Sequence, residues 1–397
     1  MSTFTTNSAY TGRAWSSSRF DVEIPAELKN ARVALVHDWL LTWRGGEKVL
    51  EAMAELFPSA PIFTLFHDSK DMPASIESHR IVSSVLNRIP GAKYRHRHLL
   101  PLMPGAIRLL DVGEVDLVIS SSHCVAKGIH VPKGAKHVSY VHAPLRYMWD
   151  RFDDYFGPGK ASLPVRAAAR LVRPGFRLWD VLTSAGVDRF ITNSAHVAQQ
   201  VAERYHRTAR VIHPPVELER FTKVELGTGE GGYFLCLGAL APYKRLDIAI
   251  EAFRRNGREL WIAGSGQSGE WLRDLPPNVK ALGQVSDAEL PKLLHDARAL
   301  VFPGVEDFGI TPLEMQACGR PVIAFGRGGA LETVTEKTGV FFHDQTAESL
   351  LTAIAEFDVF EAEFDPADAR AQAMRFSREA FQNSLLEELT AAIATKA

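Results

Sequence analysis

The sequence predicts an α/β protein of two domains, each built on a parallel sheet that helices cover on both faces. Short apolar runs, typical of buried parallel strands, alternate with stretches in which apolar residues recur at helical spacing. The chain has 397 residues, which suits two domains of ordinary size. A Pro-Pro step at residues 214–215 and a Gly-rich stretch after it separate two such series of runs.

The first series begins at Val33–Val36, which predicts a buried strand, and continues with a predicted helix at residues 47–57. Further strands are predicted at 115–119, 136–141 and 189–192. This domain is expected to span residues 31–213. Residues 1–30 are rich in Ser and Thr and lack the cationic start and apolar core of a signal peptide, so we expect a mobile extension there.

The second series follows a linker around residues 214–232. Six short strands are predicted, at 233–237, 259–263, 279–282, 299–302, 321–325 and 339–342. We expect this domain to span residues 214–375. Because ligands of such parallel sheets bind at the carboxyl ends of the strands, the loops that follow these runs are the places to look for functional residues.

Composition excludes several classes of protein. With 23% charged and 9% aromatic residues the chain is neither disordered, collagenous nor coiled coil, and no apolar run approaches the roughly 20 residues of a membrane-spanning helix. Three well-separated cysteines suit a reducing cytosol and match no zinc spacing. Residues 31–213 hold 24 Lys and Arg against 16 Asp and Glu, whereas residues 214–397 hold 18 against 28, so the two halves are expected to meet different partners.

The most informative stretch lies between the predicted strands at 299–302 and 321–325. It carries Glu306 and, eight residues later, Glu314, with Gly309 between them and Thr311-Pro312 at the expected start of a helix. The free N–H groups at a helix start favour an anion. Either glutamate alone is more simply read as a solvated charge, but the glycine, the proline and the following Gly-Arg-Pro-Val-Ile favour a ligand site.

With this stretch the chain resembles the retaining glycosyltransferases of family 4, whose GT-B fold consists of two facing Rossmann-like domains. The resemblance covers residues from 32 onward. Within the family the chain is most similar to the WbaZ-like subgroup, which includes O-antigen mannosyltransferases that use GDP-mannose. The motifs behind this narrower resemblance are His37-Asp38-Trp39, Gly45-Gly46-Glu47-Lys48, the run from Tyr140 to Asp150, and Pro242-Tyr243-Lys244-Arg245.

The resemblance implies roles for the residues of the Glu306 stretch. Glu306 is expected to bind hydroxyls of the transferred sugar, and Glu314 to hold the nucleotide ribose, because a carboxylate accepts two hydroxyl hydrogen bonds. The backbone of Phe308, Gly309 and Ile310 is expected to line the sugar and diphosphate. Gly309 is expected to leave room for the ligand, since a side chain there would fill the space.

A second donor-binding loop is expected at Lys244 and Arg245. Lys244 would neutralise charge that builds on the departing diphosphate, a form of stabilisation that often dominates catalysis. A Lys-Arg pair is also common in solvated turns. The family usually has an arginine where this chain has Ala239. Arg245, Arg320 and Arg327 are three candidates to replace it, weaker donor binding is another outcome, and the sequence does not decide among them.

In the first domain the resemblance singles out Gly45, Gly46 and His142. The two glycines are expected just ahead of a helix, where they would face the donor phosphate or the reacting centre, although a Gly-Gly pair is commonly only a turn. His142 follows the predicted strand at 136–141 and is expected to bond a hydroxyl of the donor sugar or help to place the acceptor. A core histidine is the simpler alternative. His142, Lys244 and Glu306 are the expected catalytic residues.

No metal and no other cofactor is expected. The chain contains no Asp-x-Asp, the usual carboxylate clamp of metal-dependent sugar-nucleotide enzymes in the other main transferase fold. Positive side chains and helix starts would replace the cation. A final helix at residues 376–397, as in similar proteins, is expected to cross back to the first domain.

Two basic segments of the first domain predict contact with an anionic membrane or, alternatively, a solvated basic face. Residues 93–98 run into the apolar 99–103, and Arg166, Arg170, Arg173 and Arg177 recur at helical spacing with Pro174 interrupting them. No nucleic-acid partner is expected, because a sugar-nucleotide site already accounts for the predicted anion-binding loops.

The sequence therefore predicts a GT-B enzyme that transfers a hexose, with mannose from GDP-mannose favoured, and retains the α configuration. A first domain that binds a polyprenyl-diphosphate-linked glycan would face a second that binds the nucleotide sugar, in the cytoplasm and peripherally at the inner face of the membrane. Two alternatives remain open: the same class with a UDP- or ADP-sugar, and a sugar-nucleotide-binding protein without turnover, which Ala239 motivates.

Overall fold

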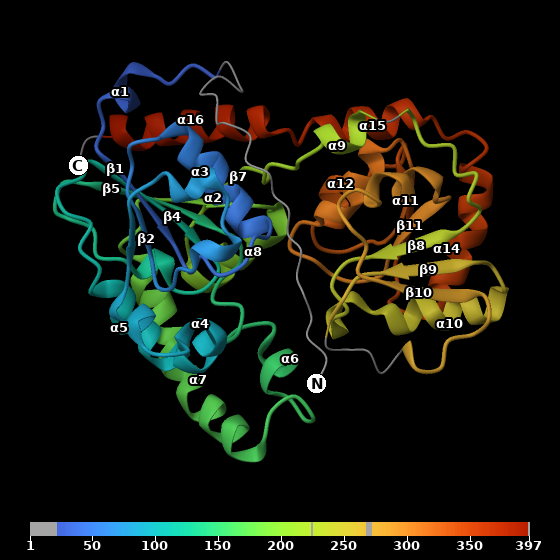
Figure 1. The fold of residues 1–397 in the computed structure, drawn as a ribbon, viewed down its shortest axis with the longest axis horizontal. Helices are drawn as coiled ribbons and strands as arrows, with labels where there is room; N and C mark the ends of the chain where they lie inside the picture. The colour runs from blue at the N-terminus through green and yellow to red at the C-terminus, as the bar shows by residue number, and fades with distance from the viewer. Residues whose placement is uncertain (1–21, 224, 267–271, 396–397) are drawn as a thin grey trace.

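A computed structural model describes residues 22–223, 225–266 and 272–395. It contains two parallel sheets, one in each half of the chain (Figure 1). The first has the order β3-β2-β1-β4-β5-β6-β7 and the second the order β10-β9-β8-β11-β12-β13, with every pairing parallel. The predicted fold class, two α/β domains facing each other as in the GT-B fold, is confirmed.

The strands of the first sheet are short and mostly apolar. They are β1 (Val33–His37), β2 (Ile62–Thr64), β3 (Ile81–Ser83), β4 (Leu117–Ser122), β5 (Lys136–Val141), β6 (Arg189–Thr192) and β7 (Ala209–Val211). All five residues of β1 are buried because both faces are covered. Leu35 packs into the core with Leu50 of helix α2 (Gly45–Leu56), whereas Val36 packs on the opposite side.

The second sheet follows the predicted runs closely. Its strands are β8 (Phe234–Leu237), β9 (Leu260–Ala263), β10 (Val279–Gly283), β11 (Ala299–Phe302), β12 (Val322–Phe325) and β13 (Gly339–Phe342). The central strands β8, β11 and β12 lie deepest, and all four residues of β11 and of β12 are buried. The loops that follow β8 and β11 therefore leave the sheet side by side at its carboxyl edge.

Helices cover both sheets. In the first domain they are α1 (Ala26–Lys29), α2 (Gly45–Leu56), α3 (Ala74–Glu77), α4 (Ala92–Arg95), α5 (Met103–Arg108), α6 (Phe152–Phe156), α7 (Leu163–Ser184) and α8 (Ala195–Tyr205). After it come α9 (Glu219–Thr222), α10 (Leu246–Asn256), α11 (Leu290–Asp296), α12 (Ile310–Ala317), α13 (Ala330–Thr333), α14 (Ala347–Phe360), α15 (Pro366–Met374) and α16 (Arg378–Ala394). Short 3-10 turns are η1 (Ser69–Asp71), η2 (Val85–Arg88), η3 (His96–Leu102), η4 (Ala126–Gly128) and η5 (Pro242–Lys244).

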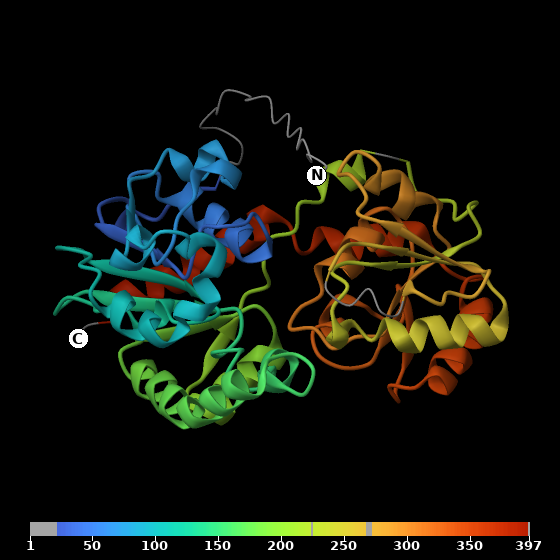
Figure 2. The same cartoon turned by 60° about the horizontal axis from the view of Figure 1, so that its bottom comes forward.

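The last helix, α16, packs on the first domain although α15, just before it, packs on the second. Phe376 lies in the core of the second domain, and Phe381 and Leu385 lie in the core of the first. At the crossing, the guanidinium of Arg378 binds Glu51 at 2.8 Å and Glu55 at 2.7 Å on α2. Figure 1 shows α16, in red, along the top of the first domain, and Figure 2 shows the same two-domain arrangement from a tilted direction.

The expected mobile extension at residues 1–30 is wrong for its last part. Leu28, in α1, is 1% exposed and packs into the same core as Leu385 and Leu389 of α16. Burying one leucine in this way favours a fixed position by about 1.5–3 kcal/mol. Residues 22–30 are thus part of the first domain, and the remainder of the predicted extension, residues 1–21, lies outside the described residues.

Candidate functional site

The loops after β8 and β11 bring Lys244 and Glu306 together. The Nζ atom of Lys244 forms an ion pair with Oε1 of Glu306, and the two side chains are 11% and 19% exposed. Nζ also lies 5.4 Å from the centre of the Phe302 ring. Gly304 permits this close approach, because a Cβ there would be 2.6 Å from the carbonyl oxygen of Tyr243. Two residues 62 positions apart therefore share one partly buried site at the edge of the second sheet.

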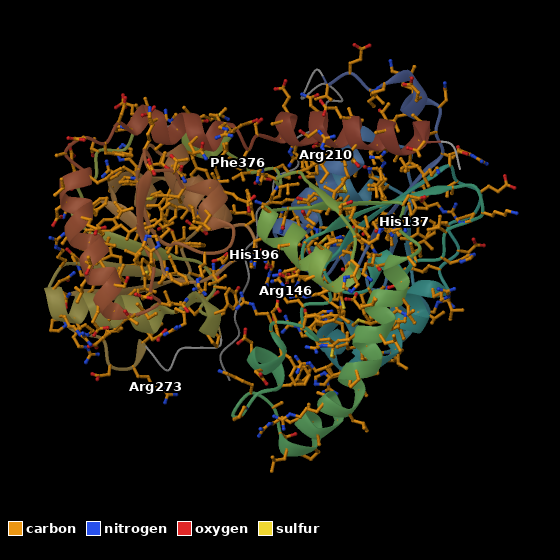
Figure 3. The ribbon with its side chains drawn as sticks, turned by 180° about the vertical axis from the view of Figure 1, so that it is seen from behind. His137, Arg146, His196, Arg210, Arg273 and Phe376 are labelled. Atoms are coloured by element: carbon orange, nitrogen blue, oxygen red, sulfur yellow. The ribbon has the colours of Figure 1, made fainter. Side chains whose placement is uncertain are left out.

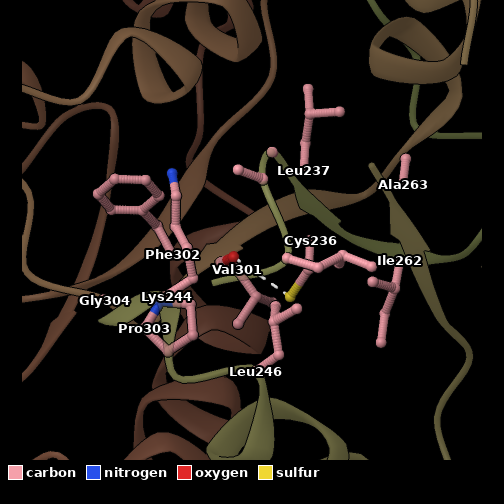
Figure 4. A pocket seen from close by; sticks show the side chains of 13 residues that line it. Cys236, Leu237, Lys244, Leu246, Ile262, Ala263, Val301, Phe302, Pro303 and Gly304 are labelled. Carbon is pink, nitrogen blue, oxygen red and sulfur yellow. Dashed lines mark hydrogen bonds between the residues drawn. The ribbon is translucent and has the colours of Figure 1, made fainter. Parts of the chain in front are cut away.

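A narrow pocket adjoins this ion pair at the carboxyl ends of β8, β9 and β11 (Figure 4). Its wall is apolar, including Cys236, Ile262 and Val301, and Lys244 is the single charged side chain among the described residues that line it. An ammonium group beside an apolar wall interacts with an anion more strongly than one in open water. Lys244 is thus suited to hold a phosphate at this edge.

Glu314, on α12, is partly buried near the same edge, with its side chain 15% exposed, and among the described residues its side chain has Arg220 as a hydrogen-bond partner. Its Oε1 accepts a hydrogen bond of 3.2 Å from Arg220 of α9, which also binds Asp287 at 2.6 Å. Burial is the largest influence and raises the pKa of Glu314 above its usual value. The expected ribose-binding carboxylate thus lies in the same domain as Lys244, but it shares its charge with an arginine that the sequence did not indicate.

The start of α12 faces the start of α2 across the two domains. Gly309 precedes α12 with φ of 93°, and this left-handed conformation is why glycine stands there, whereas a Cβ would make only ordinary contacts of 3.4–3.6 Å with Phe302 and Pro312. The left-handed conformation alone accounts for the glycine, and the expectation that it leaves room for a ligand stays a prediction. Across the domains, a Cβ on Gly45 would lie 3.1 Å from Cδ1 of Ile310.

Gly45 and Gly46 form the first two residues of α2 rather than a turn ahead of it. The helix begins early because Glu47, its third residue, accepts a hydrogen bond of 3.0 Å from the backbone N–H of Arg44. Phe308, by contrast, is 4% exposed, with its ring in the core beside Phe376, so only its backbone remains for a ligand.

His142 belongs to a buried polar group at the carboxyl edge of the first sheet. Its Nε2 lies 2.8 Å from Oγ of Ser121, and the same oxygen lies 3.1 Å from Nδ1 of His37. A Cβ on Gly46 would be 3.8 Å from both rings. Burial, followed by the neighbouring His123, holds the pKa of His142 well below its usual value. His142 is thus a neutral hydrogen-bonding group at neutral pH.

Asp38, in the same region, has a structural task that the sequence did not reveal. Its carboxylate is fully buried and accepts four backbone N–H bonds of 2.6–2.9 Å from residues 123–126. These bonds fix the loop after β4, which carries His123 toward the site. The motif His37-Asp38-Trp39 signalled the residue but not its role.

The three arginines considered as substitutes at Ala239 are placed differently. Arg320 is 5% exposed and donates hydrogen bonds to the backbone carbonyls of residues 227, 297 and 298, so it is structural and its candidacy is wrong. Arg245 is held by Asp247, at 2.9 Å, and by Gln345, at 3.0 Å. Arg327 is exposed, with its guanidinium 5.8 Å from the Phe325 ring. None of the three contacts Lys244 or Glu306 among the interactions of the described residues.

Two arginines of the first domain contact the loop that carries Glu306 instead. Arg146 forms an ion pair with Asp307. Arg151 donates a hydrogen bond of 2.8 Å to the carbonyl oxygen of Val305 and lies over the Tyr243 ring at 4.5 Å. Both stand in or next to the motif from Tyr140 to Asp150, so the sequence marked the segment, but a pairing across more than 150 residues has no local signal. Figure 3 shows Arg146 at the junction of the domains.

The same junction holds a polar cavity of about 380 Å³. Arg146, Asp150, Arg151, His196, Gln199, Gln200, Glu203, Arg204 and Asp307 contribute its polar lining. Among the described residues that line it, three arginines are matched by three carboxylates, so their formal charges cancel. A volume of this size falls within the roughly 300–1,000 Å³ of small-molecule sites.

Glu332, in the segment of residues 328–333, also joins the domains. Both of its carboxylate oxygens accept the backbone N–H of Ala195 at 2.9 Å, the first residue of α8, and Oε2 lies 2.9 Å from Nε2 of His213. A carboxylate at a helix start stabilises that helix. Glu332 thus caps a helix of the other domain.

The described part of the chain offers neither a cluster of metal ligands nor a membrane-spanning helix. Residues 22–223, 225–266 and 272–395 contain no group of three or more His, Cys, Asp or Glu side chains placed to hold a metal ion. Within the same residues, none of the helices has both the length and the apolar character needed to cross a bilayer.

Two family models match consecutive parts of the chain. The model described as Glycosyltransferase Family 4 matches residues 43–220, and the model described as Glycosyl transferases group 1 matches residues 219–358. The chain belongs to the GT-B glycosyltransferases of family 4. The two matches meet at residue 220. The Glycosyltransferase Family 4 model therefore matches the first domain of this family 4 chain, and the Glycosyl transferases group 1 model matches the second.

Curated relatives of this family 4 chain are moderately similar. The GDP-mannose-dependent monoacylated alpha-(1-6)-phosphatidylinositol monomannoside mannosyltransferase of Corynebacterium glutamicum is 32% identical over 179 residues, 38% of this chain and 47% of that protein. A D-inositol 3-phosphate glycosyltransferase of Geodermatophilus obscurus is 30% identical over 241 residues, 52% of this chain and 53% of that protein. The chain thus spans about half the length of the curated relatives that it matches.

Solved structures support the fold. Sucrose-phosphate synthase of Thermosynechococcus elongatus superposes with a TM-score of 0.66 at 19% identity, covering 91% of this chain and 99% of that one. Anabaena HepE in complex with UDP gives a TM-score of 0.63 at 16% identity, covering 91% of this chain and 100% of that one. At these identities the likeness concerns the fold of the family 4 chain.

Proposed function

We propose that the protein is a retaining glycosyltransferase that moves a hexose, mannose from GDP-mannose, onto a growing glycan without a metal ion. The observation that carries the proposal is the Lys244–Glu306 pair, partly buried where the loops after β8 and β11 meet. The named activity of the Corynebacterium relative, a GDP-mannose-dependent mannosyltransferase, favours the mannose donor. Membership of the WbaZ-like subgroup is part of the same proposal.

In the proposed reaction the diphosphate starts to leave and positive charge develops on the sugar ring. Lys244 moves from Glu306 to the phosphate and neutralises the charge that grows there. Glu306 and His142 bind sugar hydroxyls, and Glu314 holds the ribose. A leaving phosphate oxygen takes the proton of the attacking hydroxyl on the same face of the sugar, so the α configuration is retained.

Positive charge near the leaving group is available without a divalent cation. Besides Lys244, the start of α12 presents backbone N–H groups, and Lys48 on α2 is close enough to Glu314 to lower its pKa in opposition to burial. These fixed groups are the proposed replacement for a metal. Turnover unchanged by a chelator supports this; a loss of turnover that added Mg²⁺ or Mn²⁺ restores would contradict it.

The cavity of about 380 Å³ is the proposed place of the acceptor sugar. Its paired charges and amides suit a neutral sugar, whose hydroxyls both donate and accept hydrogen bonds, better than an anion. It lies beside Asp307, one residue from Glu306, so a sugar there would be next to the donor. The acceptor as a whole is proposed to be a polyprenyl-diphosphate-linked glycan.

Helix α7 is the proposed membrane contact, though not by the surface that the arginine spacing suggested. The helix continues through Pro174, and Arg173 and Arg177 turn inward, each donating a 2.9 Å hydrogen bond to the carbonyl oxygen of Met148. The outward side is apolar instead: Leu171 and Leu182 are 82% and 63% exposed. Figure 1 shows α7 at the opposite end of the first domain from α16.

These exposed leucines lie on a helix that also carries the exposed Arg170, and the exposed Lys160 precedes the helix in the chain, a combination that suits the surface of an anionic bilayer. Leu171→Asp is expected to abolish flotation with phosphatidylglycerol vesicles, whereas Val359→Asp, at a 74% exposed position of α14, is expected to leave it unchanged. Flotation of the Leu171 variant at the wild-type level would refute this surface. The proposed location is the cytoplasm, peripherally at the inner face of the membrane.

A panel of nucleotides tests the donor. GDP is expected to raise the melting temperature more than UDP or ADP, and stabilisation by UDP alone would refute the mannose donor in favour of a UDP-sugar. The second candidate, binding without turnover, is favoured by Ala239: among the described residues, no arginine of the second domain contacts the Lys244–Glu306 pair in its place. GDP-mannose binding without any glycan extension, in the presence of a lipid-linked acceptor extract, would support that candidate.

A further inference from the structure

The hydrogen-bonded group around His142 leads to a residue that no ligand contact requires, Glu47. A row of polar atoms connects them: Oε1 of Glu47 lies 3.9 Å from Nε2 of His37, Nδ1 of His37 lies 3.1 Å from Oγ of Ser121, and that oxygen lies 2.8 Å from Nε2 of His142. His37 and Ser121 are fully buried, and Glu47 is 4% exposed. His37 and Ser121 are therefore shielded from solvent.

The row has one open end and one unsatisfied atom. Nε2 of His37 is buried and has no hydrogen-bond partner, and the carboxylate of Glu47 is the acidic group nearest to it in the described structure. At the other end, no hydrogen bond within the described residues reaches Nδ1 of His142, and that atom is not among the fully buried unpaired ones. His142 thus has one ring nitrogen committed to the row and one left for a ligand.

The charge of Glu47 fixes the direction of the row. When the imidazole of His37 is neutral it carries one N–H, and an ionised carboxylate only accepts, so the charge of Glu47, 3.9 Å away, favours the proton on Nε2. Nδ1 of His37 is then an acceptor, and the single O–H of Ser121 donates to it. Oγ of Ser121 accepts in turn from Nε2–H of His142. Its remaining nitrogen, Nδ1, is left with a lone pair.

We infer that Glu47, His37 and Ser121 are positioning residues that hold neutral His142 in its Nε2–H tautomer, so that Nδ1 accepts a hydrogen bond from a ligand hydroxyl. A phosphate oxygen offers no proton at neutral pH and is rejected at this point. The inference rests on the proposed function for the ligand, a sugar. It assigns His142 to a sugar hydroxyl rather than to the diphosphate, and it gives Glu47 a task distant from the ligand.

Other groups near the row support a neutral His142. His123, held by Asp38 with Nδ1 to Oδ2 at 3.1 Å, lies with its ring centre 6.3 Å from that of His142, and both rings resist protonation because burial lowers their pKa values. Burial works to raise the pKa of Glu47, but hydrogen bonding and charge from His37, a backbone N–H and His123 together outweigh it, so the pKa lies below the usual value. The carboxylate that directs the row is therefore ionised.

The experiment is nitrogen NMR of the full chain labelled with ¹⁵N-histidine, at about pH 8, where ordinary histidines are neutral. Long-range proton–nitrogen spectra distinguish the two tautomers, and a His142→Asn sample assigns the signals. The expected result is a protonated Nε2 and an unprotonated Nδ1 at His142 in the wild type. A wild-type His142 protonated on Nδ1 overturns the inference, whatever the activity.

A variant and a matched control test the link. Ser121→Ala is expected to leave His142 as a mixture of tautomers and to lower kcat by about tenfold, the scale of one lost hydrogen bond, with GDP binding unchanged. Ser120→Ala is the control: Ser120 is equally buried, on the same strand, and lies 2.9 Å from Nε2 of another histidine, His137. The Ser120→Ala variant is expected to lose about as much stability as Ser121→Ala does, without changing the NMR signals of His142.

The outcomes separate the inference from the proposed function. If Ser121→Ala leaves the tautomer of His142 as in the wild type, the row does not set it and the inference fails. If the wild type shows the expected tautomer but transfers no sugar to any acceptor, the proposed function fails while the row stands. Because the spectra need neither donor nor acceptor, no failure of an activity assay is mistaken for a failure of the inference.

Discussion

Glu306→Gln is expected to change ligand binding and sugar transfer in opposite directions. Without ligand, the ammonium of Lys244 is bound by the carboxylate of Glu306, so an incoming diphosphate must take the lysine away from it. A glutamine holds the ammonium less tightly and does not repel phosphate. The variant is therefore expected to bind GDP more tightly than the wild type does, and to transfer sugar more slowly because the sugar loses its carboxylate partner.

The size of the gain follows from the burial of the pair. A hydrogen bond to a charged group contributes about 1.5–3 kcal/mol net. The side chains of Lys244 and Glu306 are 11% and 19% exposed, so solvent screens part of this interaction energy. The side-chain amide of the glutamine variant also keeps part of the hydrogen bond to Lys244. A net gain just below this range, about 1.4 kcal/mol, corresponds to about tenfold tighter GDP binding. Transfer is expected to fall at least about tenfold, again about 1.4 kcal/mol of barrier.

Titration calorimetry with GDP, followed by initial rates of transfer, measures both effects. The control is Glu259→Gln, which removes the carboxylate of another Lys–Glu pair in the same domain, with Lys280 at 2.6 Å. Its GDP affinity is expected to equal that of the wild type. GDP affinity of Glu306→Gln that is equal to or weaker than wild type would refute the argument that the ion pair competes with the diphosphate.

Three further predictions concern stability. Leu385 lies in α16 and is 0% exposed, so Leu385→Ala is expected to lower the free energy of unfolding, measured by urea titration, by about 2–5 kcal/mol. Leu109→Ala, at a 78% exposed position, is the control and should change that free energy little. Equal effects of the two variants would contradict the placement of α16. Asp38→Asn, which weakens four hydrogen bonds to backbone N–H groups, is expected to cost about 3 kcal/mol in the same assay, and an unchanged midpoint would contradict its role. Burial lowers the pKa of His137 to about 4, so the unfolded chain takes up a proton at this histidine before the folded chain does as pH falls. The contribution of neutral His137 to the free energy of unfolding is therefore complete above about pH 6.5, and about 1 kcal/mol of it is lost by about pH 5.5. His137→Gln should remove this loss.

The parts of the fold that the sequence predicted are those with a local signal. Val33–Val36 is a strand because a run buried on both faces must be apolar throughout, and Gly309 ahead of Pro312 marks a helix start whatever surrounds it. Strands β2, β3 and β7 were missed because three residues are too few to show a period. They are strands only because neighbouring strands offer hydrogen-bond partners.

The candidate site was predictable where one loop carries the chemistry and not where distant segments meet. Lys244 and Glu306 each stood in a recognisable motif, but the pairing of Arg146 with Asp307 depends on how two domains face each other. The spacing of Arg173 and Arg177 predicted one side of a helix with Pro174 interrupting it, and the interruption is wrong because α7 continues through Pro174. The spacing could not tell that this side points inward, because the carbonyls they bind belong to another segment.

The most direct test of the central claim follows a labelled sugar. Wild-type protein is incubated with GDP-[¹⁴C]mannose and a lipid-linked acceptor extract, with and without EDTA, and the product linkage is read by NMR. The account predicts label in the lipid fraction, joined through an α linkage, at equal rates in both samples. A β linkage, label that reaches the lipid only when a divalent cation is supplied, or no label in the lipid at all would contradict it.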